Sequence, residues 1–177
     1  MPEKLRGLIP ASQLTPENID SMREYAERVA IDEWVRRNGL SRDQCISQNL
    51  LPFTHLALGT VDVWRSGAMV ANTVLAYISH ILDDDEVVTI YGAAIEDANP
   101  STSTISVQKA GTTIYAVWDM TPIYCDLYPV GYTDKPALWS GREQVVVNLL
   151  PRITKAGGEV VVLLGIMVAK LGKFLTK

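Results

Sequence analysis

The sequence predicts a mainly β protein: a single jelly-roll-like β-barrel or sandwich of about eight strands, preceded by one N-terminal α-helix. Three observations predict it. The first 43 residues hold 15 of the 36 charged side chains, and their apolar residues recur at helical spacing. From residue 47 onward, short runs rich in Val, Ile, Thr, Tyr and Trp alternate with clusters of Gly, Pro, Asn and Asp. The runs follow one another roughly every ten residues, which is typical of a sandwich or barrel.

The helix is predicted over residues 16–38. Thr15 is a suitable N-cap, Pro16 suits the first helical position, and Gly39 can take the left-handed conformation that ends a helix. The apolar stripe consists of Ile19, Met22, Ala26, Val29, Ala30 and Trp34. Residues 16–43 hold seven acids and five bases, whereas a helix on anionic lipid is rich in Lys and Arg. We therefore expect this helix to pack beside or beneath the β domain and to contribute to protein–protein contacts.

The strands are predicted from the alternating runs and the turns between them. The predicted strands are 56–64, 69–78, 86–94, 102–108, 112–118, 122–128, 143–150 and 159–169. Residues 109–111 (KAG) predict a hairpin turn. In 112–118, the alternation points Ile114, Ala116 and Trp118 to one face and Thr113, Tyr115 and Val117 to the other.

The domain organisation follows from the length. A chain of 177 residues suggests one structural unit, which we divide into an N-terminal arm and helix (1–43) and a β-barrel domain (44–177). The most apolar run, 160–169, is ten residues long, and a spanning helix needs about 20. Residues 1–10 lack the apolar core of a secretory signal. Direct membrane insertion is therefore not expected.

The composition argues against several function classes. A net charge of −4 lacks the basic surplus of a nucleic-acid binder. Cys45 and Cys125 are too few for a disulfide framework and are most simply free thiols, although the fold could bring them together. His55 and His80 lack a neighbouring ligand pair for zinc, and no P-loop, G-x-G-x-x-G or G-x-S-x-G motif occurs. We predict no enzyme, no catalytic, cofactor-binding or metal-binding residues, and no cofactor.

Two clusters have alternative interpretations. Residues 83–86 (DDDE) form the densest acidic run: it could contribute to a calcium site, or it is a solvated turn between apolar strands, which the missing EF-hand pattern favours. The C-terminal half is also rich in aromatic residues, which can stack on sugars or anchor protein interfaces. These aromatic residues are Tyr115, Trp118, Tyr124, Tyr128, Tyr132 and Trp139. Trp118 is expected in the core, and Tyr128, Tyr132 and Trp139, which flank prolines and glycines, are expected to be exposed.

The order of these features resembles that of one protein family. Residues 87–92 (VVTIYG), 104–107 (TISV), 113–119 (TIYAVWD) and 144–149 (QVVVNL) look like consecutive barrel strands, and 159–172 looks like the last one. In this order the chain resembles the small major coat proteins of tailless icosahedral viruses with an internal membrane, which are built from upright single β-barrels. The resemblance implies a capsid subunit that is made in the host cytoplasm and resides in the virion. It also implies assembly with itself and with a second coat protein over a lipid vesicle, without catalysis.

Two other classes use the same scaffold. A carbohydrate-binding or adhesion module would use Trp139 and the nearby tyrosines as a stacking platform. A cupin-like enzyme would need a histidine-rich metal site within the strands, and two scattered histidines cannot supply it. The coat-protein hypothesis is therefore preferred.

Overall fold

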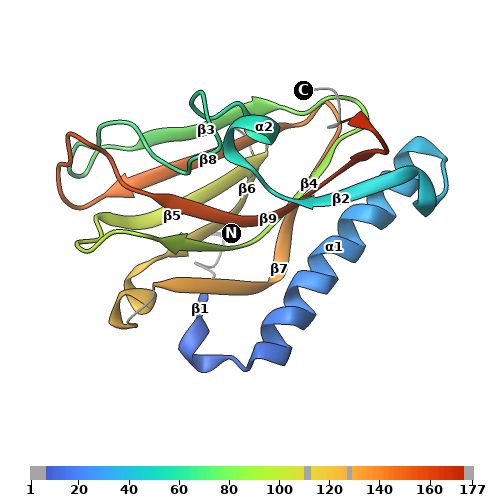
Figure 1. The fold of residues 1–177 in the computed structure, drawn as a ribbon. Coiled ribbons are helices and arrows are strands. Elements are labelled where there is room, and N and C mark those ends of the chain that lie inside the picture. Colours follow the sequence, from blue (N-terminus) through green and yellow to red (C-terminus); the bar gives the residue numbers. More distant parts are fainter. Residues whose placement is uncertain (1–6, 110–112, 127–128, 174–177) are drawn as a thin grey trace.

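The computed structural model describes residues 7–109, 113–126 and 129–173, and shows two antiparallel sheets packed face to face (Figure 1). The described strands are β1 (Ile9–Pro10), β2 (Cys45–Asn49), β3 (Leu75–Ile81), β4 (Val87–Ile95), β5 (Thr102–Lys109), β6 (Thr113–Asp119), β7 (Val130–Ser140), β8 (Gln144–Pro151) and β9 (Val161–Lys170). The helices are α1 (Pro16–Asn38) and α2 (Pro52–Leu56), and the 3-10 turns are η1 (Ala11–Gln13), η2 (Arg42–Gln44) and η3 (Thr121–Cys125). The predicted β class with one N-terminal helix is confirmed.

The strand pairing is that of a jelly roll. One sheet has the order β1-β7-β4-β9-β2 and the other β3-β8-β5-β6. The outgoing strands pair with the returning strands in nested order: β2 with β9, β3 with β8, β4 with β7 and β5 with β6. Successive pairs alternate between the two sheets, so the chain is one long antiparallel hairpin rolled into a sandwich.

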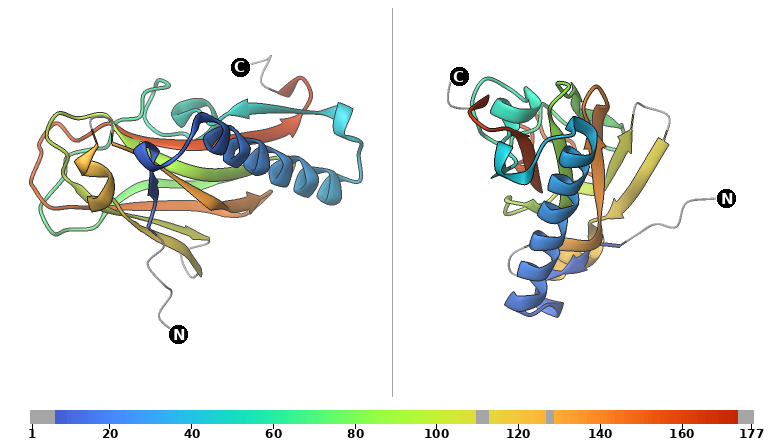
Figure 2. Two further views of the ribbon diagram at one scale, coloured as in Figure 1. Left: turned by 90° about the horizontal axis from the view of Figure 1, so that it is seen from below. Right: turned by 90° about the vertical axis from the view of Figure 1, so that its right-hand side faces the viewer.

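Helix α1 has the predicted bounds and the predicted caps. The Thr15 side chain accepts the Asn18 N–H (3.3 Å), Asn18 accepts the Thr15 N–H (3.2 Å), and Gly39 has a φ of 63°. Ala26, Ala30 and Trp34 are buried against β4 and β9 in a cluster of their own. Figure 2 shows α1 across the outer side of the five-stranded sheet, with β6 on the opposite side of the molecule. The helix therefore packs beside the barrel.

The main core lies between the two sheets. Its largest buried side chains include Trp118, Trp139, Ile105, Leu149 and Leu163. The inward residues of β8 alternate with partly exposed ones along the strand, as expected for a sheet with one buried face. No helix within the described ranges is both long and apolar enough to cross a membrane.

Two of the predicted strands are wrong. In 56–64, α2 ends at Leu56, and the residues that follow form a loop whose Asp62 carboxylate turns back to accept the N–H groups of Phe53 and Thr54 (2.9 and 2.8 Å). In 122–128, η3 forms in place of a strand, while residues 127 and 128 lie outside the described part. Alternation of apolar residues alone cannot distinguish these segments from strands.

The other strand predictions differ mainly at their ends. Predicted strand 69–78 is shifted to β3, because Asn72 has a left-handed φ of 58° and a turn precedes the strand. Strands β4, β5, β8 and β9 match their predictions within two residues. Of the predicted hairpin turn, residues 110 and 111 lie outside the described part, and β5 and β6 pair as far as Lys109 with Thr113.

Strands β1, β2 and β7 were not predicted from the sequence. In β7, Ile90 pairs with Ala137 and Gly92 with Tyr132, so residues 133–136 of β7 lie opposite Tyr91 alone. This large β-bulge consists of residues 133–136 (TDKP), whose composition is typical of a loop and interrupts an otherwise regular strand. Its composition explains why the pattern did not predict a strand.

Candidate functional site

Both histidines of the chain line one groove beside α2. The groove has a volume of about 750 Å³. Its lining residues are Phe53, Thr54, His55, Ala57, Val61, Asp62, His80, Asp83 and Glu86. The fold therefore brings together His55 and His80, which are separate in the sequence.

Two polar side chains of this groove, Asp62 and His55, hold the local structure. Asp62 also accepts the Thr54 hydroxyl (2.7 Å); burial opposes its charge, but the bonds from Thr54 and Phe53 outweigh this and lower its pKa. His55 Nδ1 accepts the Leu51 N–H (2.9 Å), which fixes the start of α2. These bonds position α2 and give the groove a structural role.

The acidic turn at 83–86 is an ion-paired cluster. The Lys173 ammonium lies 3.0 Å from the Asp83 carboxylate, 2.5 Å from that of Asp85 and 3.1 Å from that of Glu86. Burial opposes the charge of Lys173, yet its hydrogen bonds to the three carboxylates prevail and raise its pKa. Glu86 is buried and accepts the Asp83 N–H (2.9 Å). The turn therefore binds the Lys173 ammonium through three carboxylates. It is not a purely solvated turn.

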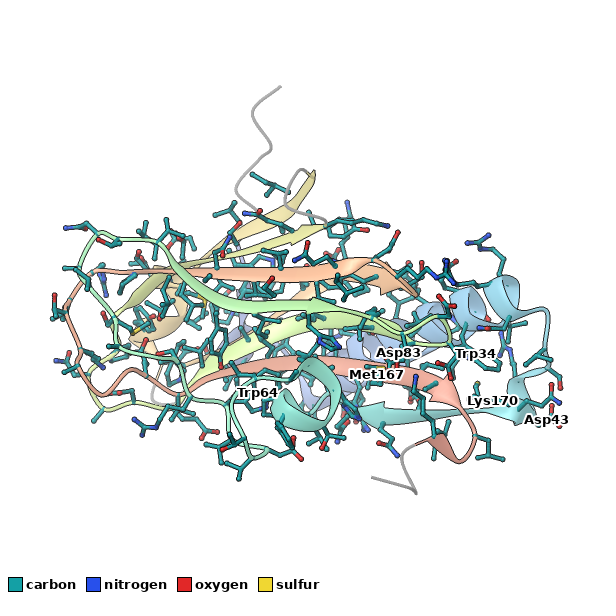
Figure 3. All side chains as sticks on the ribbon, turned by 90° about the horizontal axis from the view of Figure 1, so that it is seen from above. Trp34, Asp43, Trp64, Asp83, Met167 and Lys170 are labelled. Atoms are coloured by element: carbon teal, nitrogen blue, oxygen red, sulfur yellow. The ribbon has the colours of Figure 1, made fainter. Side chains whose placement is uncertain are left out.

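The same turn also contacts helix α1. The indole N–H of Trp34 donates to the Asp85 carbonyl (2.8 Å), and Figure 3 places Trp34 beside the turn that carries Asp83. Arg142 pairs with the Asp84 carboxylate. Among the described residues, no group of three or more His, Cys, Asp or Glu side chains is arranged to hold a metal ion. The four carboxylates of 83–86 are instead paired with Lys173 and Arg142.

A second carboxylate cluster lies at the other end of the sandwich. Glu159 is completely buried and accepts the N–H groups of Ser101 (2.6 Å) and Thr102 (3.0 Å) and the Thr102 hydroxyl (2.5 Å). The Lys155 ammonium lies 3.1 Å from Glu159 and 3.0 Å from Asp97. Burial opposes the charge of Lys155, but both carboxylates outweigh it and raise its pKa. The backbone donors of Glu159 are 57 and 58 residues away, so among these partners only Lys155 is near it in the sequence.

The aromatic residues of the C-terminal half are mostly internal. Trp118 is buried, as predicted, but the predicted exposure of Trp139 is wrong: its exposed fraction is 0%, and its indole N–H donates to the Gln108 carbonyl (3.0 Å). Tyr115 packs edge-on against Trp139, with ring centres 5.3 Å apart. Tyr132 is partly exposed and stacks on Tyr91. Tyr128 lies outside the described residues.

A β-bulge explains the position of Tyr115. Val107 pairs with Ala116 and Gln108 with Ile114, so Tyr115 is the extra residue on β6. The predicted alternation placed Tyr115 opposite Ala116 and Trp118, whereas the bulge lets it join the main core and donate its hydroxyl to the Leu138 carbonyl (2.7 Å). Trp139 is buried and Tyr115 packs against it, so these two rings form no exposed stacking platform.

Of the two cysteines, only Cys45 has a described side chain. Cys45 is a free thiol that donates to the Arg42 carbonyl (3.2 Å). Burial raises its pKa, which keeps it in the less reactive thiol form. The side chain of Cys125 lies outside the described part of the structure.

The outer face of the sheet β3-β8-β5-β6 differs from the rest of the surface in its chemistry. The register places thirteen side chains on this face, and all are partly or fully exposed. They are Ala76, Ser79, Ile81, Thr104, Ser106, Gln108, Ile114, Val117, Asp119, Gln144, Val146, Asn148 and Leu150. We call this set the neutral face, because twelve of its residues are uncharged.

The single charge of the neutral face lies at its margin. Asp119 is the last residue of the edge strand β6, and its carboxylate accepts the Thr121 N–H (2.9 Å). The low charge of this surface is partly visible in the sequence, because residues 99–141 hold only five charged side chains. The face itself was not predictable, because it combines strands from distant segments.

No family model matches the sequence, and no curated protein matches it. Function must therefore be inferred from the chain's own geometry.

Proposed function

We propose that this protein is a structural, self-assembling coat subunit that forms part of an icosahedral virus shell and performs no catalysis. The observation that carries the proposal is the nested jelly-roll pairing around an interior filled by the chain's own side chains. Jelly rolls serve mainly as capsid, lectin and cupin domains. Fold alone does not decide among these three, so the site chemistry has to.

The interior and the surface favour the coat-protein class. A cupin carries metal ligands within its barrel, whereas here Trp118, Trp139, Ile105 and Leu149 fill the space between the sheets. A sugar-binding module needs exposed aromatic rings, whereas Trp139 is buried. A shell subunit requires only a rigid body with surfaces that fit its neighbours. The partners in this proposal are further copies of the chain and a second coat protein.

Electron microscopy and mass spectrometry of particles from the native source test the proposal. We expect this chain to be a major component of icosahedral particles of uniform diameter, and the virion to be its location. Purified chain, alone or with co-purifying coat protein, should also form shells or flat arrays. Its consistent absence from such particles, with the chain recovered elsewhere, would overturn the proposal.

A further inference from the structure

We infer that the neutral face is an interaction surface for the same face of a second copy of this chain. The first argument is its lack of charge. A sheet face that is exposed only to water normally carries several charged side chains. On this face, twelve of thirteen residues are neutral. Depletion of charged residues is one of the features that distinguish the centre of a protein interface from other surface.

The shortage of charge is specific to this face. The opposite side of the sandwich is covered by α1, which carries Glu17, Asp20, Glu24, Arg28 and Arg36. The margin of the neutral face is charged as well: Lys109 pairs with Glu143 where β5 and β8 meet the rim. A neutral centre with a charged rim is the usual composition of an interface.

The chemistry of the face selects a second copy as the partner. Its polar groups are hydroxyls and amides, such as those of Ser106, Gln108 and Asn148, and each both donates and accepts hydrogen bonds. Such a face can satisfy itself across a two-fold axis, with no like charges opposed. A nucleic acid or a strongly charged protein would find little counter-charge here beyond Asp119 at the margin, and a sugar would find no aromatic ring on which to stack.

The size of the face sets the expected strength. Four strands spaced about 4.8 Å apart, with about seven residues each, give roughly 400–450 Å² of sheet. A stable pair usually buries about 800 Å² per partner, so this contact is weak by itself. We therefore expect dimerisation in the micromolar to millimolar range, strengthened when other contacts hold the subunits together.

Sedimentation velocity of the full chain, from about 10 μM to about 1 mM, tests the inference over that weak range. We expect the mass to rise from 19.5 kDa toward twice that value. Ser106→Lys and Asn148→Lys alter side chains on neighbouring central strands, and each should weaken association at least roughly tenfold, because like charges meet across the axis. The matched control is Ser21→Lys on the exposed side of α1, which should associate as the unchanged protein does.

The outcomes are separable from those of the proposed function. Unchanged melting temperatures of both face variants, measured by circular dichroism, show that the fold is intact. A chain that stays monomeric at about 1 mM would overturn the inference, because even weak interfaces populate dimers there. Neutral-face variants that associate as strongly as the Ser21→Lys control would also overturn the inference. Neutral-face dimers without native particles would contradict only the coat-protein proposal, and particles assembled equally well by both variants would contradict only this interface.

Discussion

Single buried carboxylates hold the two ends of the sandwich. Glu159 joins the β4–β5 connection to the β8–β9 turn, and Glu86 helps to join the β3–β4 turn to Lys173 near the end of the described chain. The two clusters lie at opposite ends of the strands (Figure 1). A buried charge is tolerated only when it is paired and hydrogen-bonded, and both carboxylates meet this condition.

Glu159→Gln should destabilise the fold. The amide keeps one acceptor oxygen but turns an NH₂ group toward backbone donors and leaves the ammonium of Lys155 without its buried counter-charge. We expect a loss of about 2–4 kcal/mol in the free energy of unfolding, measured by urea titration. Glu96→Gln, an exposed position in the adjoining connection, serves as the control and should change stability by less than about 0.5 kcal/mol. Equal effects of the two changes would contradict this role of Glu159.

A buried tyrosine makes the fold sensitive to alkali. The Tyr77 hydroxyl donates to the Val161 carbonyl (2.6 Å), and burial raises the pKa of Tyr77. The folded protein keeps this proton to a higher pH than the unfolded chain does, so the stabilisation is complete below about pH 10 and is lost as the pH rises above it. Tyr124, Lys155 and Lys173, whose pKa values are also raised, act in the same direction.

Tyr77→Phe should reduce this alkaline loss of stability. At neutral pH it should cost about 1 kcal/mol, because the Val161 carbonyl loses its buried donor. Urea titrations from about pH 8 to about pH 11 should then show a shallower decline than in the unchanged protein. Tyr25→Phe, on the exposed surface of α1, is the control. Parallel stability curves for Tyr77→Phe and the unchanged protein would refute the assignment.

Among the elements, α1 is held against the sheet by its three buried side chains, Ala26, Ala30 and Trp34. Small Ala26 and Ala30 allow the helix to approach the sheet closely, and Trp34 is buried over β4 and β9. The other apolar residues of the stripe, Ile19, Met22 and Val29, stay partly exposed. The helix is therefore attached mainly through the segment from Ala26 to Trp34.

Trp34→Ala should loosen this attachment. It removes a buried indole and its hydrogen bond to the Asp85 carbonyl, at a cost of about 3–5 kcal/mol in unfolding free energy. Limited proteolysis should then cut within or just after α1 before the β-sandwich unfolds. Tyr25→Ala removes an aromatic ring from the exposed part of the same helix, and we expect it to leave the protease pattern unchanged. Equal protection of the helix in all three proteins would show that Trp34 does not anchor it.

The predictability of each element depended on how local its determinants are. The bounds of α1 were predictable because its caps, Thr15 and Gly39, are adjacent in sequence to the helix they end. Strand β7 was not, because the bulge at 133–136 interrupts the alternation and remote pairing with β4 restores the strand. Trp139 shows the same limit: its neighbours in sequence predicted exposure, whereas tertiary packing buries it. The neutral face was visible only as a low density of charge.

At the scale of the whole molecule, charge is distributed unevenly between the two sides. The helix-covered side carries charged residues of both signs, and the neutral face carries one. Association through the neutral face should therefore depend little on ionic strength, because no exposed ion pairs form across it. This distinguishes it from association through α1.

We accordingly expect the dissociation constant to change less than about threefold between about 0.05 M and 0.5 M NaCl. Sulfate at equal ionic strength should strengthen association, because it favours burial of apolar surface. Sedimentation equilibrium across the salt series measures both effects. A weakening of tenfold or more with NaCl would instead point to the charged surface of α1 as the site of contact.

The nested pairing has a consequence for synthesis on the ribosome. Strand β2 pairs with β9, and roughly 120 residues separate the partners, which at about 5–20 residues per second takes about 6–24 s to translate. During that interval α1 has no completed sheet on which to bury Trp34. Strand β8 lies between β3 and β5, so the neutral face does not exist until Pro151 has left the exit tunnel. Nascent chains therefore cannot pair through it before β8 has emerged from the ribosome, which restricts this contact to chains in which all four strands of this sheet are available.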